Sequence, residues 1–221
     1  MHICGNIYGF IWESMTENNC NTYLIDGSPR ILVDPGHQHL FGHVEDGLSD
    51  LGLGIEDIGL VICTHAHPDH LEAAALFREG SAQIAYHEAD WALVKSMMAL
   101  HGGESSPSPD ALRPDFFLTE GTLRVGDMDF QVIHTPGHAP GAICLYQPDE
   151  KVLITGDLVF QDGVGRTDLP GGDGRMLKES IRRVAALDVK WVLPCHGEII
   201  SGADEVKTNF HQIENVWFAY I

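Results

Sequence analysis

Six consecutive residues, His65-Ala66-His67-Pro68-Asp69-His70, supply three imidazoles and a carboxylate within about one turn of chain. Neutral imidazole and carboxylate are the usual protein ligands of borderline divalent metals such as zinc, iron and manganese. The segment follows the apolar run Leu60-Val61-Ile62-Cys63, which predicts a buried strand that ends in a loop. The sequence therefore predicts a metal site at the carboxyl end of a strand, and the alternative is a histidine-rich surface turn that binds nothing.

Three later segments repeat this layout, because in each of them polar side chains follow directly on a short apolar run. These segments are His134-Thr135-Pro136-Gly137-His138, Thr155-Gly156-Asp157 and Pro194-Cys195-His196-Gly197. Side chains on loops at strand ends are held by a rigid scaffold, as catalytic residues often are. We therefore expect the second half of the chain to supply further metal ligands.

Length and charge limit the classes of function. A chain of 221 residues is long enough for one well-buried domain, and we expect a single domain over residues 1–221. It carries 32 acidic and 13 basic residues, for a net charge of -19. Nucleic acids and anionic membranes bind basic surfaces, so neither is an expected partner. We expect a small-molecule substrate, while the oligomeric state stays open.

The cysteines and the apolar runs indicate a compartment. The chain has five cysteines, an odd number, and no pair of them has CxxC spacing, which is typical of reduced thiols in a reducing compartment. The first residues lack a basic region followed by a long apolar stretch. No apolar run reaches the roughly 18 residues needed to cross a bilayer. We therefore expect a soluble cytoplasmic protein.

Strand-like runs and helical spacings alternate in both halves, and they predict a layered α/β domain with two sheets inside and helices outside. Strands are expected at Ile3–Trp12, Asn21–Ile25, Arg30–Val33, Gly59–Cys63, Gln83–Tyr86, Thr122–Val125, Asp129–Ile133, Ala142–Tyr146, Val152–Ile154 and Trp191–Leu193. Helices are expected at His37–Leu51, Asp69–Phe77 with Asp69 as its cap, His87–Leu100, Gly174–Leu187 and Ala203–Ala219. The segment His101–Pro114 is predicted to be a mobile loop, acting either as a lid or as a surface loop with no role.

The order of these residues resembles a known family. The pattern His65-x-His67-x-Asp69-His70, followed by His138, Asp157 and His196, resembles the metallo-β-lactamase superfamily over about residues 20–200. Within it, the segments Thr135-Pro136-Gly137-His138, Gly156-Asp157 and Gly165-Arg166-Thr167-Asp168 resemble glyoxalase II-type hydrolases and their persulfide dioxygenase relatives. The resemblance implies a four-layer αββα metallo-β-lactamase sandwich of the α/β (α+β) class, with the metals at one edge.

The resemblance also implies a dinuclear metallohydrolase. It assigns the metal ligands as His65, His67 and His138 on one ion, Asp69, His70 and His196 on the second, and Asp157 as the bridge. Two divalent ions per chain are implied, with zinc first and iron or manganese as alternatives. A hydroxide between the ions would attack the carbonyl of a thioester, or of a related ester or lactone, with Asp69 orienting it.

Two other functions remain open at this point. The first is a mononuclear iron persulfide dioxygenase, in which His65, His138 and Asp157 would hold the iron. The second is a non-catalytic metal-binding or redox module. The retained His67 argues against this module, because the flavodiiron relatives carry a Glu at that place in the motif.

Arg166 is notable because basic residues are scarce. In the resembling glyoxalase II enzymes, a basic residue near this position contacts the glutathione moiety, so Arg166 is a candidate substrate-binding residue. The alternative is a structural ion pair with Asp168. His134, four residues before His138, is expected to be a buried, hydrogen-bonded residue that supports the ligands.

The remaining candidates are weaker. His37, His39 and His43 lie on or near a predicted helix and are expected to be solvated helix residues, with metal binding as the alternative. Cys195 precedes His196, and we do not expect it to be a nucleophile, because the histidine that would activate it is already assigned as a ligand.

Overall fold

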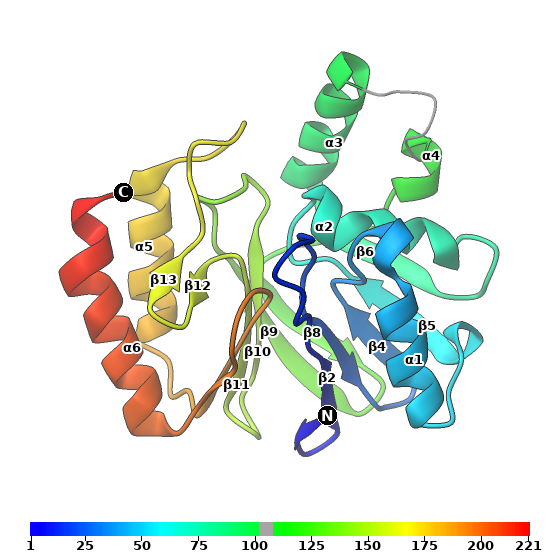
Figure 1. Ribbon diagram of the computed structural model, residues 1–221, viewed down its shortest axis with the longest axis horizontal. Helices are drawn as coiled ribbons and strands as arrows, with labels where there is room; N and C mark the ends of the chain where they lie inside the picture. Colours follow the sequence, from blue (N-terminus) through cyan, green and yellow to red (C-terminus); the bar gives the residue numbers. More distant parts are fainter. Residues whose placement is uncertain (102–107) are drawn as a thin grey trace. The chain divides into compact units, whose positions relative to one another are not determined.

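The chain folds into two units in the computed structural model, which describes residues 1–101 and 108–221 (Figure 1). Unit 1 comprises Met1–Leu118 with Val125–Met128, and unit 2 comprises Thr119–Arg124 with Asp129–Ile221. Each unit has its own sheet, and helices pack against one face of that sheet. Each unit therefore has one sheet and one helical layer.

Seven strands of the described part of unit 1 form one sheet in sequence order. They are β1 (His2–Cys4), β2 (Ile7–Phe10), β3 (Thr22–Ile25), β4 (Arg30–Val33), β5 (Ile58–Ile62), β6 (Gln83–His87) and β7 (Phe116–Leu118). Strands β1 to β4 pair antiparallel, whereas β4 to β7 pair parallel. The carboxyl ends of β4, β5 and β6 therefore lie at one edge of the sheet.

The single strand expected over Ile3–Trp12 is wrong, because the structure divides it into β1 and β2. Gly5 lies between them with a φ of +50°, a left-handed conformation that glycine adopts without steric cost. The chain therefore turns back on itself, and β1 pairs with β2 as a hairpin.

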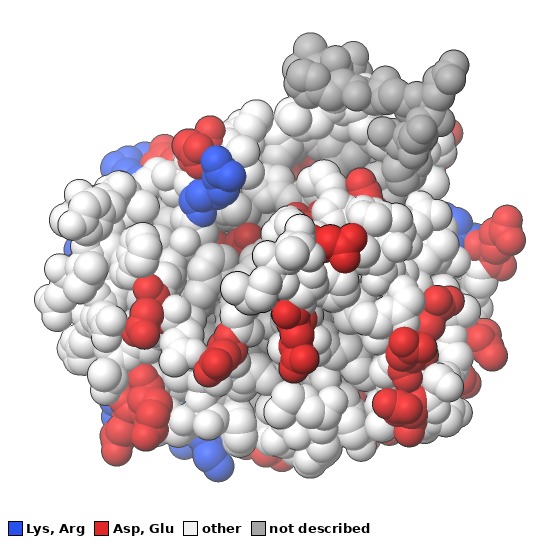
Figure 2. Space-filling model, viewed as in Figure 1, with Lys and Arg blue, Asp and Glu red and all other residues white. Residues whose placement is uncertain are grey.

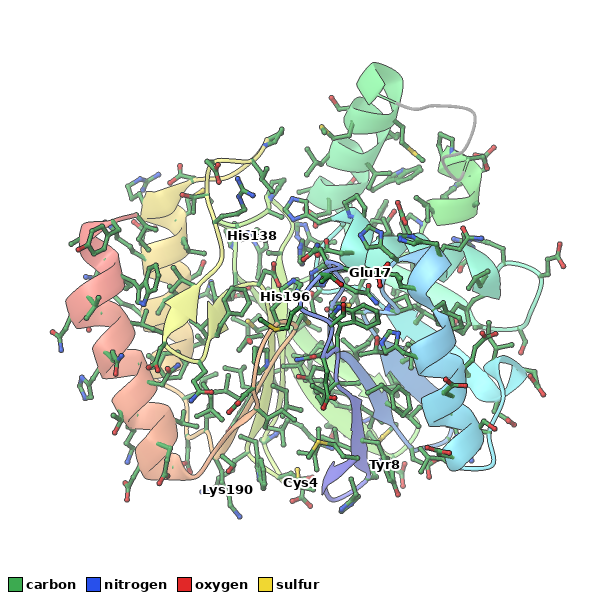
Figure 3. The ribbon with its side chains drawn as sticks, in the orientation of Figure 1. Cys4, Tyr8, Glu17, His138, Lys190 and His196 are labelled. Atoms are coloured by element: carbon green, nitrogen blue, oxygen red, sulfur yellow. The ribbon has the colours of Figure 1, made fainter. Side chains whose placement is uncertain are left out.

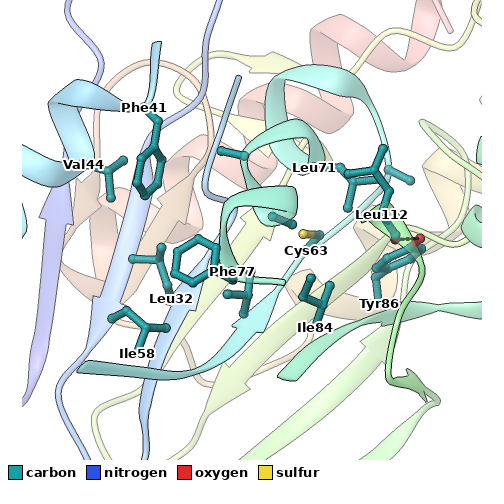
Figure 4. Close-up of a cluster of buried hydrophobic side chains, with 14 of the residues drawn as sticks. Leu32, Phe41, Val44, Ile58, Cys63, Leu71, Phe77, Ile84, Tyr86 and Leu112 are labelled. Carbon is teal, nitrogen blue, oxygen red and sulfur yellow. Dashed lines mark hydrogen bonds between the residues drawn. The ribbon is translucent and has the colours of Figure 1, made fainter. Parts of the chain in front are cut away.

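The helical segments of unit 1 are η1 (Gln38–Leu40), α1 (Gly42–Asp50), η2 (Ile55–Asp57), α2 (Pro68–Leu71), η3 (Glu72–Phe77), α3 (Glu88–His101) and α4 (Pro109–Leu112). Figure 4 shows their apolar side chains packed on those of the sheet, with Phe41 and Phe77 edge to face at 5.8 Å. At the edge of this cluster, the Tyr86 hydroxyl donates to Leu112 O at 2.7 Å.

The expected cap at Asp69 is wrong. The N-cap of α2 is His67, and Pro68 occupies the first helical position. Proline favours this position because its fixed φ suits the helix and its missing N–H would have no partner there. Asp69 therefore lies inside the first turn, and the helix changes to the tighter η3 after Leu71.

Six strands of the described part of unit 2 form a second sheet, in the order β15-β14-β11-β10-β9-β8. Their bounds are β8 (Gly121–Val125), β9 (Met128–His134), β10 (Ile143–Gln147), β11 (Val152–Gly156), β14 (Trp191–Pro194) and β15 (Ile200–Ser201). A separate ribbon joins β12 (Val159–Phe160) to β13 (Gly163–Val164). Because β9 and β11 are both antiparallel to β10, and β14 is parallel to β11, the carboxyl ends of β9, β11 and β14 share one edge.

Two helices, α5 (Gly174–Ala185) and α6 (Ala203–Val216), cover one face of this sheet (Figure 1). Asp173 caps α5 by accepting from Met176 N at 2.9 Å, a bond of the kind that stabilises a helix by about 1 kcal/mol. After α6 the chain forms η4 (Trp217–Ala219), whose Trp217 and Phe218 pack against the cluster around Phe210. The final stretch therefore packs on the core of unit 2.

Surface charge and cysteines agree with the sequence. Acidic side chains outnumber basic ones on the face that Figure 2 shows. The five cysteines all lie in described residues and none forms a disulfide.

Residues 102–107 of the expected loop His101–Pro114 lie outside the described residues, and the rest of it includes the short helix α4. Among the helices that the structure describes, none is long and apolar enough to cross a membrane.

Candidate metal centre

Unit 1 places the first four predicted ligands together, directly after β5. His65 and His70 are buried, whereas His67 and Asp69 are partly exposed. His65 Nε2 lies 3.0 Å from His67 Nδ1, and the rings of His65 and His70 lie 3.9 Å apart between centroids. The turn that presents them is pinned by Asp90 of α3, whose buried carboxylate accepts from Ala66 N at 2.8 Å.

Asp34 is a buried carboxylate behind these ligands that the sequence analysis did not single out. It follows β4 with a φ of +53°, and its oxygens accept from Thr64 N and Thr64 Oγ1, each at 2.7 Å. The same Oδ2 lies 3.2 Å from His70 Nδ1, and Thr64 Oγ1 lies 3.3 Å from His65 Nδ1. Asp34 therefore orients two imidazoles from behind, as partners of metal-binding histidines commonly do. The available signal was that Asp34 follows a strand next to β5.

Asp69 is fixed by a residue from a distant loop. Asn18 Nδ2 donates to Asp69 Oδ2 at 2.7 Å, and the same oxygen lies 3.9 Å from His70 Nε2. The Asn18 amide restricts the rotation of the carboxylate and stabilises its charged form. Nothing in the sequence pattern pointed to Asn18, because 51 residues separate it from Asp69.

Unit 2 places the other three predicted ligands at the shared edge of β9, β11 and β14. Asp157 follows β11, and its two oxygens face different histidines: Oδ2 lies 3.4 Å from His138 Nε2, and Oδ1 lies 3.4 Å from His196 Nε2. Figure 3 labels the two histidines on the loops above this sheet. One carboxylate therefore stands between two imidazoles, as a bridging ligand would.

The orientation of His138 is set by the loop that carries it. Its Nδ1 lies 2.7 Å from Arg166 O, and only the tautomer with a proton on Nδ1 makes this a hydrogen bond, so Nε2 is left as the ligand atom toward Asp157. Gly137, with a φ of +140°, lies so close to α5 that a Cβ would stand 2.3 Å from Leu177 N. Only glycine permits this approach.

Further hydrogen bonds hold the same loop against α5. Ser180 Oγ donates to Pro136 O at 2.8 Å, and Arg183 donates to His134 O at 3.0 Å. His134 Nε2 lies 2.9 Å from Pro140 O across the base of the loop. His134 is thus hydrogen-bonded as expected, although it is half-buried rather than buried.

The donor set fits a divalent metal ion. Ligand atoms about 2.0–2.2 Å from one ion lie roughly 3.0 Å apart in octahedral and 3.4 Å apart in tetrahedral geometry. The separations of 3.0 Å between His65 and His67 and of 3.4 Å on each side of Asp157 lie in this range. The 3.4 Å pairs are longer than ordinary hydrogen bonds. Imidazole with carboxylate suits zinc, iron and manganese.

Arg166 forms the ion pair with Asp168 that the sequence analysis held as an alternative to substrate binding. Two parallel bonds of 2.7 Å join the guanidinium to the carboxylate. The guanidinium lowers the pKa of Asp168 to about 2. Both side chains are more than half exposed to solvent, so water screens the pair.

The two thiols near these ligands are buried, and that of Cys63 is a poor nucleophile. Cys195 is completely buried beside His196. Burial raises the pKa of Cys63, which precedes Thr64, well above its usual range, with the Asp34 charge as a second cause. A thiol with a raised pKa stays protonated and unreactive at neutral pH.

The three histidines that were expected on a solvated helix lie in two different places in the structure. His43 packs edge to face on Trp12 with ring centroids 5.0 Å apart, and burial lowers its pKa. His37 and His39 instead lie together with ring centroids 5.1 Å apart, close to Glu72. His39 belongs to η1 and His43 to α1, so these two histidines do not lie on one face of a single helix.

Comparisons with known proteins match residues of both units. A family model described as the Metallo-beta-lactamase superfamily matches residues 15–196. The hydroxyacylglutathione hydrolase GloC of Haemophilus influenzae is 32% identical over 201 residues, covering 87% of this chain and 92% of that protein. A probable metallo-hydrolase of Methanocaldococcus jannaschii is 34% identical over 189 residues, covering 81% and 88%. The crystal structure of TTHA1623 in a di-iron-bound form is 30% identical, with a TM-score of 0.69, and the match covers 86% and 93%.

Proposed function

The chain belongs to the metallo-beta-lactamase superfamily of metallo-hydrolases, and from this premise we propose that it hydrolyses thioesters in the manner of glyoxalase II-type enzymes. The expected α/β fold of this superfamily is confirmed by the family match and by the structural neighbour. The thioester is the finer part of the proposal. It is supported by the relative GloC, whose name states hydroxyacylglutathione hydrolysis.

We propose that the two units act as one domain and bring their ligands to a common dinuclear centre. In this centre, the side chains would be shared as His65, His67 and His138 on one ion, Asp69, His70 and His196 on the other, and Asp157 on both. Zinc is the proposed metal. The di-iron form of TTHA1623 keeps iron as an alternative.

The observation that carries the proposal is the position of Asp157 between two histidines of unit 2. Each of its oxygens lies 3.4 Å from one imidazole nitrogen, and Arg166 O holds the His138 tautomer that presents Nε2. A carboxylate that served only as a hydrogen-bond acceptor would draw these nitrogens to within about 3.2 Å.

The bound ions would lower the pKa of a water molecule to about 7 and polarise the thioester carbonyl. Water adds to the carbonyl carbon, the carbon–sulfur bond breaks, and the products are a carboxylic acid and a thiol. In the chain itself, Asn18 holds the Asp69 carboxylate, which would orient the attacking water and accept its proton. Asp34 keeps His65 and His70 from rotating.

Arg166 is the proposed contact for a carboxylate of the substrate's glutathione moiety. The chain has 13 basic residues, and the Arg166 guanidinium is 62% exposed in its pair with Asp168. A substrate carboxylate could replace Asp168 at little cost, because water screens this exposed ion pair. The fork geometry of arginine suits such bidentate recognition.

Thiol release from a hydroxyacyl-glutathione thioester by the metal-loaded protein tests the proposal. We expect hydrolysis that is lost on chelation and restored by zinc. Asp157→Asn should lower the rate by more than the roughly 10–100-fold that loss of a partner behind the ligands costs. A well-metallated protein that cleaves no thioester, ester or lactone would refute the proposal, and oxygen uptake with glutathione persulfide would replace it with the dioxygenase.

A pair of arginine variants tests the substrate contact. Arg166→Ala should raise KM for the glutathione thioester roughly five- to tenfold and leave KM for a thioester without glutathione unchanged. Arg175→Ala is the matched control, because Arg175 also forms an exposed ion pair in unit 2, with Glu179. Equal effects of the two variants would remove Arg166 from the substrate site.

A further inference from the structure

His37, His39 and Glu72 form a second cluster of metal-ligand side chains, separate from the seven proposed ligands and wholly within unit 1. Each offers a ligand atom within 4.8 Å of the other two. The histidines come from the loop after β4 and from η1, whereas Glu72 begins η3, and η1 packs against η3. Two imidazoles and a carboxylate are a ligand set that zinc sites use.

Hydrogen bonds of the backbone hold the cluster in place, and none of them uses the side chains of His37, His39 or Glu72. His37 N donates to Asn19 Oδ1 at 2.8 Å. Gly36 N donates to His70 O at 3.3 Å, and Ala73 N donates to Gly36 O at 2.9 Å. Gly36 has a φ of +87°, and a Cβ there would lie 2.6 Å from Asn19 Oδ1. The loop of His37 is therefore fixed beside the helix of Glu72.

The side chains are close and accessible to a metal ion in solution. His37 Nδ1 lies 2.7 Å from Glu72 Oε2, and these side chains are 19% and 28% exposed. His39 is exposed, and its ring centroid lies 5.1 Å from that of His37. A hydrogen bond of 2.7 Å is shorter than the roughly 3.4 Å between two tetrahedral ligands. An ion that replaced the shared proton would need the two atoms to part by less than about 1 Å.

We propose that His37, His39 and Glu72 bind a borderline divalent cation, represented by Zn²⁺, with water completing its coordination. This site is distinct from the proposed dinuclear centre and does not depend on the proposed function. It would join two segments that carry parts of that centre, since His37 follows Asp34 by three residues and Glu72 follows His70 by two. Bound Zn²⁺ would therefore stabilise unit 1.

The test is a zinc titration of the metal-loaded protein by equilibrium dialysis and elemental analysis. We expect the wild type to bind about one Zn²⁺ per chain more than His39→Ala at micromolar free zinc. Glu72→Gln should lose the same ion, because an amide can still accept the hydrogen bond from His37 but is a poor zinc ligand. His211→Ala is the control, since His211 is an exposed histidine of α6.

Thermal unfolding gives a second readout that does not depend on catalysis. Zinc at about ten times its dissociation constant should raise Tm of the wild type by about 3–6 °C relative to His39→Ala. Equal zinc binding and equal Tm shifts in the wild type, His39→Ala and Glu72→Gln would overturn the site. Equal loss of zinc in His211→Ala would also overturn it. Thioester activity does not enter either outcome.

Discussion

Replacing Asp34 by Asn tests whether this buried carboxylate holds the metal-binding histidines. Asn tolerates the left-handed backbone of Asp34, so the change removes the charge without adding strain. One oxygen keeps the bond to Thr64 N, but an amide group now meets Thr64 Oγ1 and His70 Nδ1. The His70 imidazole must then accept at Nδ1, which places its proton on Nε2, the nitrogen otherwise left for a metal ion.

The expected cost follows from these contacts. Loss of one hydrogen bond to a buried charge lowers the free energy of unfolding by about 2 kcal/mol, which corresponds to a fall in Tm of about 4–8 °C for a chain of this size. Metal affinity should fall about 10–100-fold, as when a partner behind a ligand is removed. Thermal unfolding with chelator present measures the first effect, and metal competition with a coloured chelator measures the second.

Two variants make the result interpretable. Asp162→Asn is the matched control, because Asp162 is an exposed aspartate with a φ of +55°, and it should change stability by less than about 0.5 kcal/mol. Thr64→Val removes one hydrogen bond to Asp34 but leaves the charge of the carboxylate. It should therefore lower the free energy of unfolding by about 1 kcal/mol and reduce metal affinity less than Asp34→Asn does. Wild-type metal affinity and Tm in Asp34→Asn would refute the reasoning.

Three further predictions follow from the structure. Chelation should lower Tm by about 5–10 °C, because a metal present at about 100 times its dissociation constant stabilises the fold by about 2.7 kcal/mol, and added zinc should reverse the fall. A hydrogen bond from Arg183 lowers the pKa of Glu120 in the folded protein. The ionised Glu120 therefore stabilises the fold above its unfolded pKa of about 4.3, and this stabilisation is lost as pH falls through its folded pKa. Denaturant unfolding of Arg183→Gln should show a loss of stability at pH 7 whose pH-dependent part is at most about 1 kcal/mol, since the pair is half-exposed, and this part should shrink as pH falls below about 4.3. Burial lowers the pKa of His43, so stability should decline as pH falls below about 6.5, and His43→Gln should reduce the decline in Tm between pH 7.5 and 5.5.

The sequence predicted most strands and both long helices of unit 2, because their apolar spacing is strong and local. It missed β7 and β15, which are two or three residues long and exist because an existing sheet edge offers hydrogen bonds. It also treated Ile3 to Trp12 as one strand, since the effect of Gly5 on the backbone depends on pairing between β1 and β2. Patterns over a few residues cannot show such pairing.

Within the candidate metal centre, the sequence determined the ligand types, their order and their places after strands. Only the tertiary structure decided what holds each ligand. Asp34 reaches His70 because β4 pairs parallel with β5, and Asp157 meets both His138 and His196 because β9, β11 and β14 end at one edge of a sheet. These partners are 19 to 39 residues apart in the chain. A side chain's identity is local, whereas its partner is chosen by strand pairing across the whole sheet.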